Sequence, residues 1–360
     1  MEEERKHRSL ADFLRENAAQ VDHWFAGEES FVHHEIREEE SLAPSEFWER
    51  EEWGEFPENL EGAPDFPRVF FVDGRMRVHV RLLVRTAVLL LAEVAAGYAV
   101  WERGRGLSFG FSPSSPPSLE RVMGAGESLA LRARVEQPEI DLGMGLVFRI
   151  EESQRHSRGL PGVEVAHQAV FNAMQRLERE EVERLLTRGA PVVKDGTIHF
   201  VEPREFHPGI GPCGLVKGVE ELRLPQGWLD CLFRLGRGRR TPFVSSFLER
   251  EETDTLRVFS YVRLVEQSPL FPWKGLVRLE AIVPKARFSE FRGEISWLFD
   301  GLARVLPLLS GDYPWRRLPE NIFPIIALEE RLAQHFASSS LVRELTERML
   351  FWGRRERGGV

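Results

Sequence analysis

One long helical segment lies between two groups of strand-like segments, and this order constrains the fold more than any other feature. Residues 163–188 contain no Gly or Pro and follow Pro161-Gly162, which predicts one uninterrupted helix. Apolar or alternating runs typical of strands lie on both sides of it: 68–72, 76–82, 129–135, 142–150, 190–200, 213–219, 242–248, 256–265 and 275–283. Helical patterns follow at about 291–309, 321–336 and 339–351. The mixed order predicts an α/β fold, in which helices flank a sheet and the C-terminal part is helical.

The first strand-like region contains two details that affect the topology. Asp73-Gly74 follows an apolar run, and this dipeptide predicts a hairpin at Gly74. Beyond it, apolar residues alternate with polar ones, which predicts a half-buried strand with Met76, Val78, Val80 and Leu82 on its buried face. The apolar segment 87–101 is compatible with either a buried strand or a helix.

The chain divides into three predicted parts. Residues 1–62 are acidic and are predicted to form a helical N-terminal arm, which is either a solvated extension packed on the domain or a partner-binding element. Residues 63–338 form the main domain, and residues 339–360 add a C-terminal helix and tail. No internal repeat interrupts this organisation.

Composition excludes several classes of protein. Hydrophobic residues make up 42% of the chain and charged residues 29%, which indicates a globular protein. Two cysteines cannot form a disulfide framework, and the first residues lack an apolar signal-peptide core, so we expect a reducing cytoplasm. The apolar segment 87–101 is shorter than the roughly 20 residues of a spanning helix, which argues against a membrane protein. A net charge of −9 gives no global attraction to phosphate, but it leaves room for a local basic groove.

A carboxylate interrupts the apolar stripe of the central helix. The apolar members of this stripe are Phe171, Met174, Val182 and Leu185. Glu178 falls on the same stripe by helical spacing. A charge turned toward a core is costly unless it is paired or metal-bound, so Glu178 is expected to need a partner. The alternative is that Glu178 reaches water or an arginine such as Arg179 or Arg184.

Two aspartates complete a candidate metal site. Asp73 and Asp195 each end an apolar strand, and Glu178 faces inward from the helix between them. Carboxylate oxygens suit Mg²⁺ or Mn²⁺, and two such ions can activate a water and stabilise the leaving oxygen of a phosphodiester. The pattern predicts metal-assisted phosphodiester hydrolysis, although each Asp-Gly is also a common turn dipeptide.

Several motifs in order resemble those of one nuclease family. They are Phe70-Phe-Val-Asp-Gly74, the helix with Glu178, Val193-Lys-Asp-Gly196, Gly214-Leu-Val-Lys217, Gly275-Leu-Val-Arg-Leu-Glu280 and the tail from Tyr313 to Glu329. Together, over about residues 66–337, they resemble the NurA nucleases. The resemblance implies a ribonuclease H-like core, a homodimer, and Mn²⁺-dependent cleavage of DNA, with Mg²⁺ as a second possible cofactor. It also implies that Asp73, Glu178 and Asp195 hold the metal.

The resemblance further implies a setting for the activity. It implies 5′–3′ exonuclease and single-strand endonuclease activity, with a hexameric HerA-type DNA translocase as partner in processing DNA ends for repair. No nucleotide-binding P-loop occurs in the chain, so ATP-driven movement would have to come from another protein.

Three further residues complete the predicted catalytic set. Lys217, one of only five lysines, would neutralise a scissile phosphate, or it is an ordinary lysine at a strand end. Tyr313 would position substrate or stack on a base, and an interface role is the alternative. Asn321 stands where many relatives place His or Asp, and its carbonyl oxygen can ligate a metal but cannot act as a base.

A segment rich in Arg and Gly is the candidate DNA contact. Its basic residues are Arg234, Arg237, Arg239 and Arg240. Interleaved glycines predict a flexible basic loop that could follow a DNA backbone, and a solvated loop is the alternative. The main hypothesis is therefore a metal-dependent deoxyribonuclease. The second is a catalytically weak DNA-binding or scaffold subunit of a translocase complex, which Asn321 favours.

Overall fold

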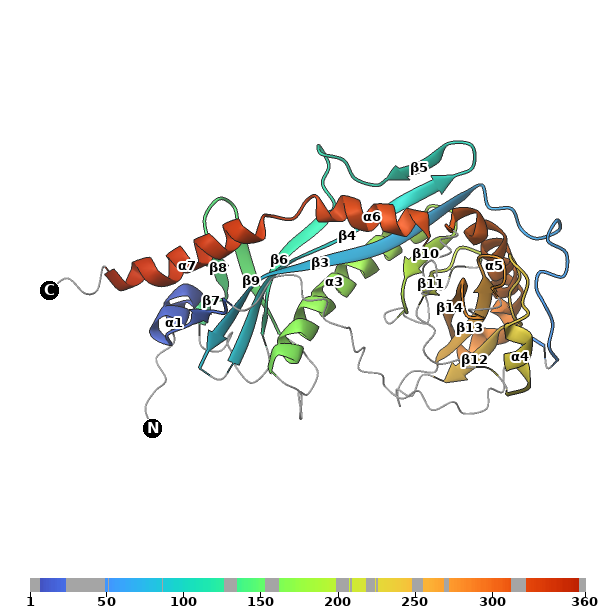
Figure 1. The fold of residues 1–360 in the computed structure, drawn as a ribbon, viewed down its shortest axis with the longest axis horizontal. Coiled ribbons are helices and arrows are strands. Elements are labelled where there is room, and N and C mark those ends of the chain that lie inside the picture. The colour runs from blue at the N-terminus through green and yellow to red at the C-terminus, as the bar shows by residue number, and fades with distance from the viewer. Residues whose placement is uncertain are drawn as a thin grey trace.

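A twelve-stranded mixed sheet with helices packed on it dominates the computed structural model of the chain (Figure 1). This confirms the predicted α/β class. The structure describes residues 7–23, 49–50, 52–85, 87–125, 135–152, 162–198, 207, 209–217, 224, 226–247, 255–268, 272–311 and 322–355. Within these residues, no helix is long and apolar enough to cross a membrane.

The strands and helices follow the predicted order closely. The strands of the large sheet are β2 (Gln20–Val21), β3 (Arg68–Val84), β4 (Ala87–Glu102), β5 (Gly106–Phe109), β6 (Ser118–Ala125), β8 (Glu139–Asp141), β9 (Val147–Glu152), β10 (Val192–Asp195), β11 (Cys213–Val216), β12 (Val244–Phe247), β13 (Thr255–Arg263) and β14 (Leu276–Pro284). Strands β1 (His7–Ser9) and β7 (Val135–Gln137) form a separate pair. The α-helices are α1 (Leu10–Glu16), α3 (Gly162–Leu186), α4 (Leu229–Leu232), α5 (Phe288–Leu309), α6 (Phe323–Ala333) and α7 (Ser339–Arg355).

The pairing of the strands changes from antiparallel to parallel near the middle of the large sheet. Its order is β12-β13-β14-β11-β10-β3-β4-β6-β9-β8, with β2 beside β3 and β5 beside β4. Strands β3, β4 and β6 form an antiparallel meander, whereas β10 runs parallel to both β3 and β11. The connection from β6 to β10 contains the long helix α3. Parallel pairing brings the carboxyl ends of β10 and β11 to the same edge.

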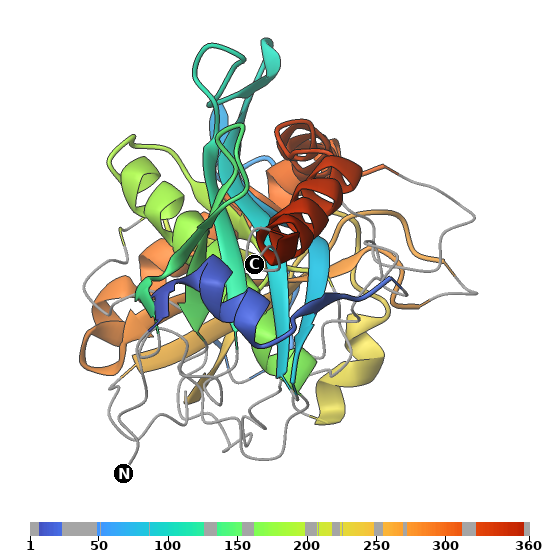
Figure 2. The ribbon, with the colours of Figure 1, turned by 90° about the vertical axis from the view of Figure 1, so that its left-hand side faces the viewer.

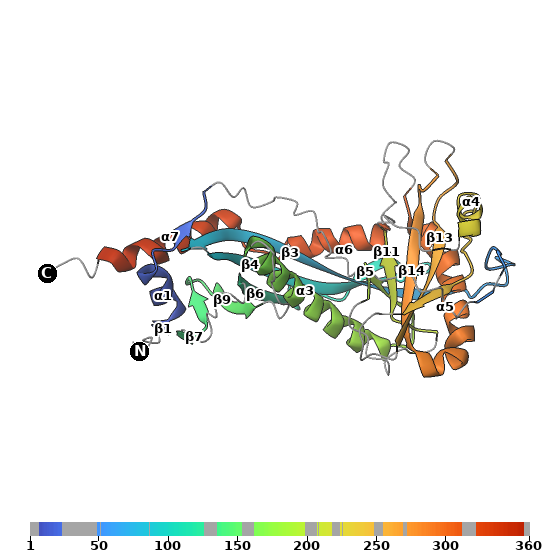
Figure 3. The same cartoon turned by 90° about the horizontal axis from the view of Figure 1, so that it is seen from below.

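Helices cover both faces of the meander. Helix α3 lies along one face, while α6 and α7 lie along the other (Figures 2 and 3). On the α3 face, strand residues such as Val78 and Ala92 pack with Ala166 and Val170. On the opposite face, apolar residues of β3 and β4 pack with the buried side of α6. The two layers of apolar contacts hold the central strands between helices.

Strand β4 resolves the open choice at residues 87–101. It pairs with β3 on one side and with β5 and β6 on the other, and most of its residues are buried. A strand covered on both faces needs apolar residues on both, so it shows no alternation. That is why its sequence could equally suit a buried helix.

The expected hairpin at Gly74 is wrong, because β3 runs through this residue without a turn. A Cβ atom at Gly74 would lie 2.7 Å from the Met174 Cγ and 2.8 Å from the Glu178 Oε1. Glycine is therefore needed here for the close approach of α3 to the strand, and not for a turn.

The expected alternation along residues 76–82 is also interrupted. Val78 pairs with Ala92, but Val80 pairs with Leu91, so His79 forms a β-bulge. The bulge turns Val80 toward the face opposite to that of Val78, and His79 is completely buried. A pattern of period two cannot reveal an inserted residue, which is why His79 was expected on the polar face.

Much of the predicted N-terminal helical arm lies outside the described residues, which within it are 7–23, 49–50 and 52–62. Helix α1 is its one helix in the described residues, and residues 52–67 form turns and irregular backbone that contains several Pro and Gly residues. Helix α1 packs against the distant helix α7, where the Arg15 Nε donates a hydrogen bond of 2.8 Å to the Met349 carbonyl oxygen. The domain boundary at residue 62 stays a prediction.

Candidate metal centre

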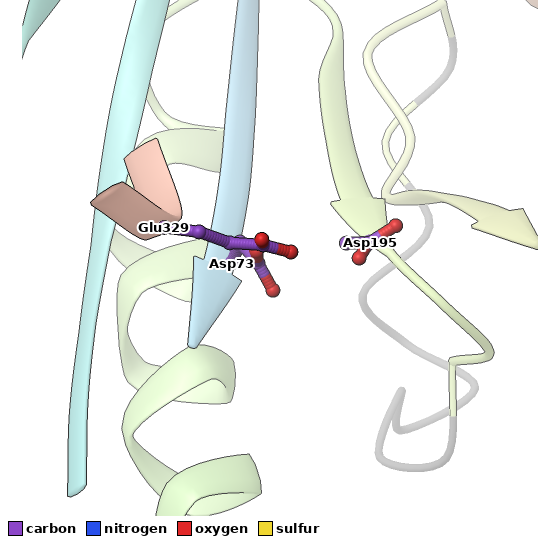
Figure 4. A group of neighbouring side chains, drawn as sticks. All are labelled: Asp73, Asp195 and Glu329. Atoms are coloured by element: carbon purple, nitrogen blue, oxygen red, sulfur yellow. The ribbon is translucent and has the colours of Figure 1, made fainter. Parts of the chain in front are cut away.

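Three carboxylates from separate parts of the chain meet beside the centre of the sheet. Strand β10 pairs in parallel with β3 so that Lys194 lies opposite Val72, which places Asp195 beside Asp73. Glu329 reaches the same place from α6 (Figure 4). One carboxylate oxygen from each of the three residues lies within 4.8 Å of the other two. The predicted convergence of Asp73 and Asp195 is therefore present.

Glu329 is a member of this group that the sequence analysis did not single out. It lies on α6 next to the buried residues Ile325, Leu328 and Leu332, with which it shares one helical face. Its side chain is 34% exposed, and its Oε2 lies 4.0 Å from the Arg75 guanidinium. A carboxylate on the apolar face of a helix is the same pattern that identified Glu178, and it could have identified Glu329.

Glu178 is buried as its spacing predicts, but its closest charged contact is a lysine. It is 2% exposed, and its Oε2 lies 2.9 Å from the Lys194 Nζ. Arg179 and Arg184 pair with Glu183 and Glu181 instead, so neither arginine is the partner of Glu178. Glu178 lies behind Gly74 on the α3 face and does not belong to the group of three ligand atoms within 4.8 Å.

The electrostatics of the centre favour a cation. Burial raises the pKa of Asp73 well above its ordinary value, and the nearby charges of Asp195, Glu178 and Glu329 raise it further, while Lys217 opposes them. Asp73 Oδ2 and Asp195 Oδ1 are buried and accept no hydrogen bond from any described residue. Buried carboxylate oxygens without donors are costly unless a cation satisfies them.

Two lysines border the carboxylates at different depths. The Lys194 side chain is only 5% exposed, and its Nζ also donates a 2.6 Å hydrogen bond to the Asp195 carbonyl oxygen. Burial would lower the pKa of Lys194, but Glu178 and the two aspartates raise it above its ordinary value. The Lys217 Nζ lies 2.8 Å from the Asp195 Oδ2, and its side chain is 21% exposed. Lys217 therefore stands at the accessible side of the centre, whereas Lys194 lies beneath it.

The residues present fit a hard divalent cation. All three ligand groups are carboxylates, and such oxygens suit Mg²⁺ or Mn²⁺ better than the softer metals that bind sulfur or imidazole. The unpartnered oxygens of Asp73 and Asp195 belong to this group. Metal binding is therefore chemically consistent with the geometry.

The expected flexible basic loop is a packed segment in which the arginines contact the protein itself. Arg240 is fully buried and binds Glu49 and Asp300, so its assignment to DNA is wrong. Arg237 donates to the Leu264 and Pro307 carbonyl oxygens. These bonds hold Arg237 against the protein, although the residue itself is exposed.

The other two arginines of this segment differ in exposure. Arg239 donates to the Pro57 carbonyl oxygen and is half-buried. Arg234 is exposed, and the one hydrogen bond described for its side chain, 3.4 Å from Nε to the Asp230 carbonyl oxygen, is long. Of the four, Arg234 and Arg237 are the exposed residues, and the Arg234 side chain makes fewer hydrogen bonds with the protein. Tyr313 and Asn321, the remaining predicted site residues, lie outside the described residues.

Comparison with family models and curated proteins identifies no relative. No family model matches the chain, and no curated protein matches it. The function of the chain must therefore be inferred from its own side chains and from the motifs in its sequence.

Proposed function

We propose that the chain is a divalent-metal-dependent nuclease that cleaves DNA. The observation that carries this proposal is the meeting of Asp73, Asp195 and Glu329, with Lys217 beside them. Carboxylates that hold Mg²⁺ or Mn²⁺ next to an accessible lysine suit the hydrolysis of a phosphodiester, because its reaction develops negative charge on phosphate oxygens.

The strand order supports a ribonuclease H-like core. Strands β11, β10, β3, β4 and β6 are neighbours, and they combine two parallel pairs with an antiparallel meander. Helix α3 lies between β9 and β10 in the chain, and it places Glu178 behind Gly74, the residue that follows Asp73. This arrangement agrees with the core that the resemblance to the NurA nucleases implies.

Each residue has a distinct role in the proposed reaction. A divalent cation, when bound, would supply Lewis-acid activation of a water. Asp73, Asp195 and Glu329 would hold that cation, and Lys217 would bind a phosphate oxygen from the accessible side. Glu178 and Lys194 form a buried pair that supports the floor of the centre.

Substrate and partners follow from the resemblance. We expect Mn²⁺ as the preferred cofactor, DNA ends and single strands as substrates, and a HerA-type hexameric ATPase as the motor. We also expect a homodimer. The net charge of −9, which comes mainly from glutamates, does not attract DNA to the protein as a whole. Binding of DNA therefore depends on local contacts such as Lys217.

An assay on labelled single- and double-stranded DNA tests the proposal. The purified chain should form products with Mn²⁺ or Mg²⁺ and none with EDTA. Asp195→Asn should lower the cleavage rate by at least about 1,000-fold, or about 4 kcal/mol of transition-state stabilisation. Asp230→Asn, at an exposed site, is the matched control. DNA binding without any metal-dependent product would instead favour the scaffold subunit.

A further inference from the structure

A buried polar network lies on the same face of the sheet as the metal centre. The bulge in β3 turns His79 toward the connection between α6 and α7. Glu93 on β4 lies beside it, and both side chains are completely buried. Neither residue contacts the three carboxylates of the metal centre, so the proposed reaction leaves this network unexplained.

Glu93 joins three separate elements. Its Oε2 accepts a 2.6 Å hydrogen bond from the Ala337 backbone N–H and lies 3.1 Å from the His79 Nε2. Its Oε1 accepts a 2.8 Å hydrogen bond from the Arg121 Nε on β6. The His79 Nδ1 lies 3.0 Å from the Ser339 Oγ at the start of α7. The carboxylate thus ties the segment after α6 to the sheet.

The network is built to hold a charge. Burial would raise the pKa of Glu93, but its hydrogen bonds with His79 and Ala337 lower it below the ordinary value. A buried carboxylate with this many donors has little freedom to move. Ser339, His79 and Glu93 follow the order of a hydrolase triad, but the imidazole is fully buried, which suits packing and not acyl transfer.

Helix α6 extends from this network to the metal centre. Arg77, the partner of Glu93 across the two strands, lies four residues after Asp73, or about 13 Å along β3. Glu329 reaches the aspartates from α6, and Ala337 meets Glu93 just beyond the end of the helix. The Arg77 guanidinium also lies 5.3 Å from the centre of the Phe336 ring.

Apolar contacts alone would fix the helix poorly. Ile325, Leu328 and Leu332 pack on the sheet, but such contacts are non-directional and tolerate small shifts along the strand. The hydrogen bond from Ala337 to Glu93 is directional and sets the position of the helix end. A shift of about 1 Å would be enough to change the geometry of a metal ligand.

We propose that Glu93 is a positioning residue of the metal centre: by holding the segment after α6, it keeps Glu329 within reach of Asp73 and Asp195. The inference rests on the proposed metal-dependent function. It assigns no chemical step to Glu93 itself.

Calorimetric titration of the full chain with Mn²⁺, without DNA, tests this inference. Glu93→Gln should raise the Mn²⁺ dissociation constant about tenfold, as loss of outer support does at metal sites. Ser339→Ala, a milder change in the same network, should raise it about threefold and serves if Glu93→Gln does not fold. Glu120→Gln removes the charge of a glutamate on β6 that pairs with Arg176, and it should leave the Mn²⁺ dissociation constant unchanged.

A double variant separates positioning from general destabilisation. If Glu93 acts through Glu329, then Glu93→Gln should cause no further loss of Mn²⁺ affinity in a Glu329→Gln background. An unchanged dissociation constant in the single variant, or a full tenfold loss in the double variant, overturns the inference. Wild-type protein that binds Mn²⁺ but cleaves no DNA would contradict the proposed nuclease and leave the inference intact. Wild-type protein that binds no Mn²⁺ would contradict both.

Discussion

Two glutamates approach the same strand from helices on opposite faces of the sheet, yet their surroundings differ. Glu178 on α3 is 2% exposed and lies 2.9 Å from the Lys194 Nζ. Glu329 on α6 keeps 34% of its side chain exposed and lies in the carboxylate group with Asp73 and Asp195. Both occupy the apolar face of an amphipathic helix, so the pattern that places them is the same.

The difference shows that an inward carboxylate can serve two purposes. A buried glutamate with its own lysine is neutralised inside the protein and contributes to the floor of the centre. A half-exposed glutamate beside two aspartates remains available to an external cation. Helical spacing identifies the inward position, and the neighbouring charges decide which purpose it serves.

Breaking the buried pair should have the largest effect. Glu178→Gln should lower the free energy of unfolding by about 3–5 kcal/mol, because the buried Lys194 would lose its closest counter-charge. Adding Lys194→Met should recover most of this loss. Urea unfolding of the metal-free protein measures both variants, with the exposed Glu180→Gln on the same helix as control. Unchanged stability of the Glu178→Gln variant would mean that the ion pair between Glu178 and Lys194 does not stabilise the fold.

Removing the charge of the partly exposed Glu329 should lower activity and leave the fold intact. Glu329→Gln should reduce cleavage about 100-fold, or about 2.7 kcal/mol, because one of three metal ligands loses its charge. Rates at saturating Mn²⁺, together with melting curves, measure the two properties separately. Its exposed neighbour Glu330→Gln should cleave normally. Equal loss in both variants would contradict a ligand role for Glu329.

The accessible lysine should matter less than a ligand. Lys217→Met should slow cleavage about tenfold, because the phosphate would lose one charge contact while the carboxylates remain. Lys217→Arg should retain more activity than Lys217→Met. Single-turnover rates provide the comparison, with Lys285→Met, beyond β14, as control. An unaffected Lys217→Met would identify this residue as an ordinary lysine at a strand end.

The smallest effect should be a pH-dependent gain in stability. The pKa of Asp73 is raised in the folded protein, so the folded state binds its proton more tightly than the unfolded chain does. Without metal, the free energy of unfolding therefore falls as the pH rises from the ordinary pKa of an aspartate, about 4, through the raised pKa of Asp73. In EDTA, Asp73→Asn should melt a few degrees above wild type at pH 8 and much closer to it at pH 5. A difference that does not depend on pH would argue against this account.

Much of the architecture could be predicted from the sequence, because its periodic segments were long. Helix α3 and the C-terminal helices lie close to the expected residues, as do most of the expected strands. The convergence of Asp73 and Asp195 was predicted from two apolar runs that each end in an acid, although β3 continues past Asp73. These features depend on local patterns that tertiary contacts did not override.

The misses arose where a distant part of the chain decides the outcome. Gly74 suggested a turn, but its missing side chain instead allows α3 to approach β3 closely, at Met174, which lies 100 residues later in the chain. His79 is buried because of a bulge that the period of the strand cannot show. Arg240 looked exposed beside glycines, yet Glu49 and Asp300 enclose it. In each case the partner is remote in sequence, and the local pattern of a single sequence does not reveal it.

The contact between α1 and α7 has a consequence for how the protein is made. Arg15 in α1 bonds to Met349 in α7, and Glu329 meets Asp73 across a shorter but still long separation in sequence. During synthesis, the apolar surface of the early strands therefore stays uncovered until the last helices leave the ribosome. Such late closure prolongs the exposure of apolar surface, which favours aggregation of the nascent chain. It also means that a message truncated before α6 would yield a product that has both aspartates and no Glu329.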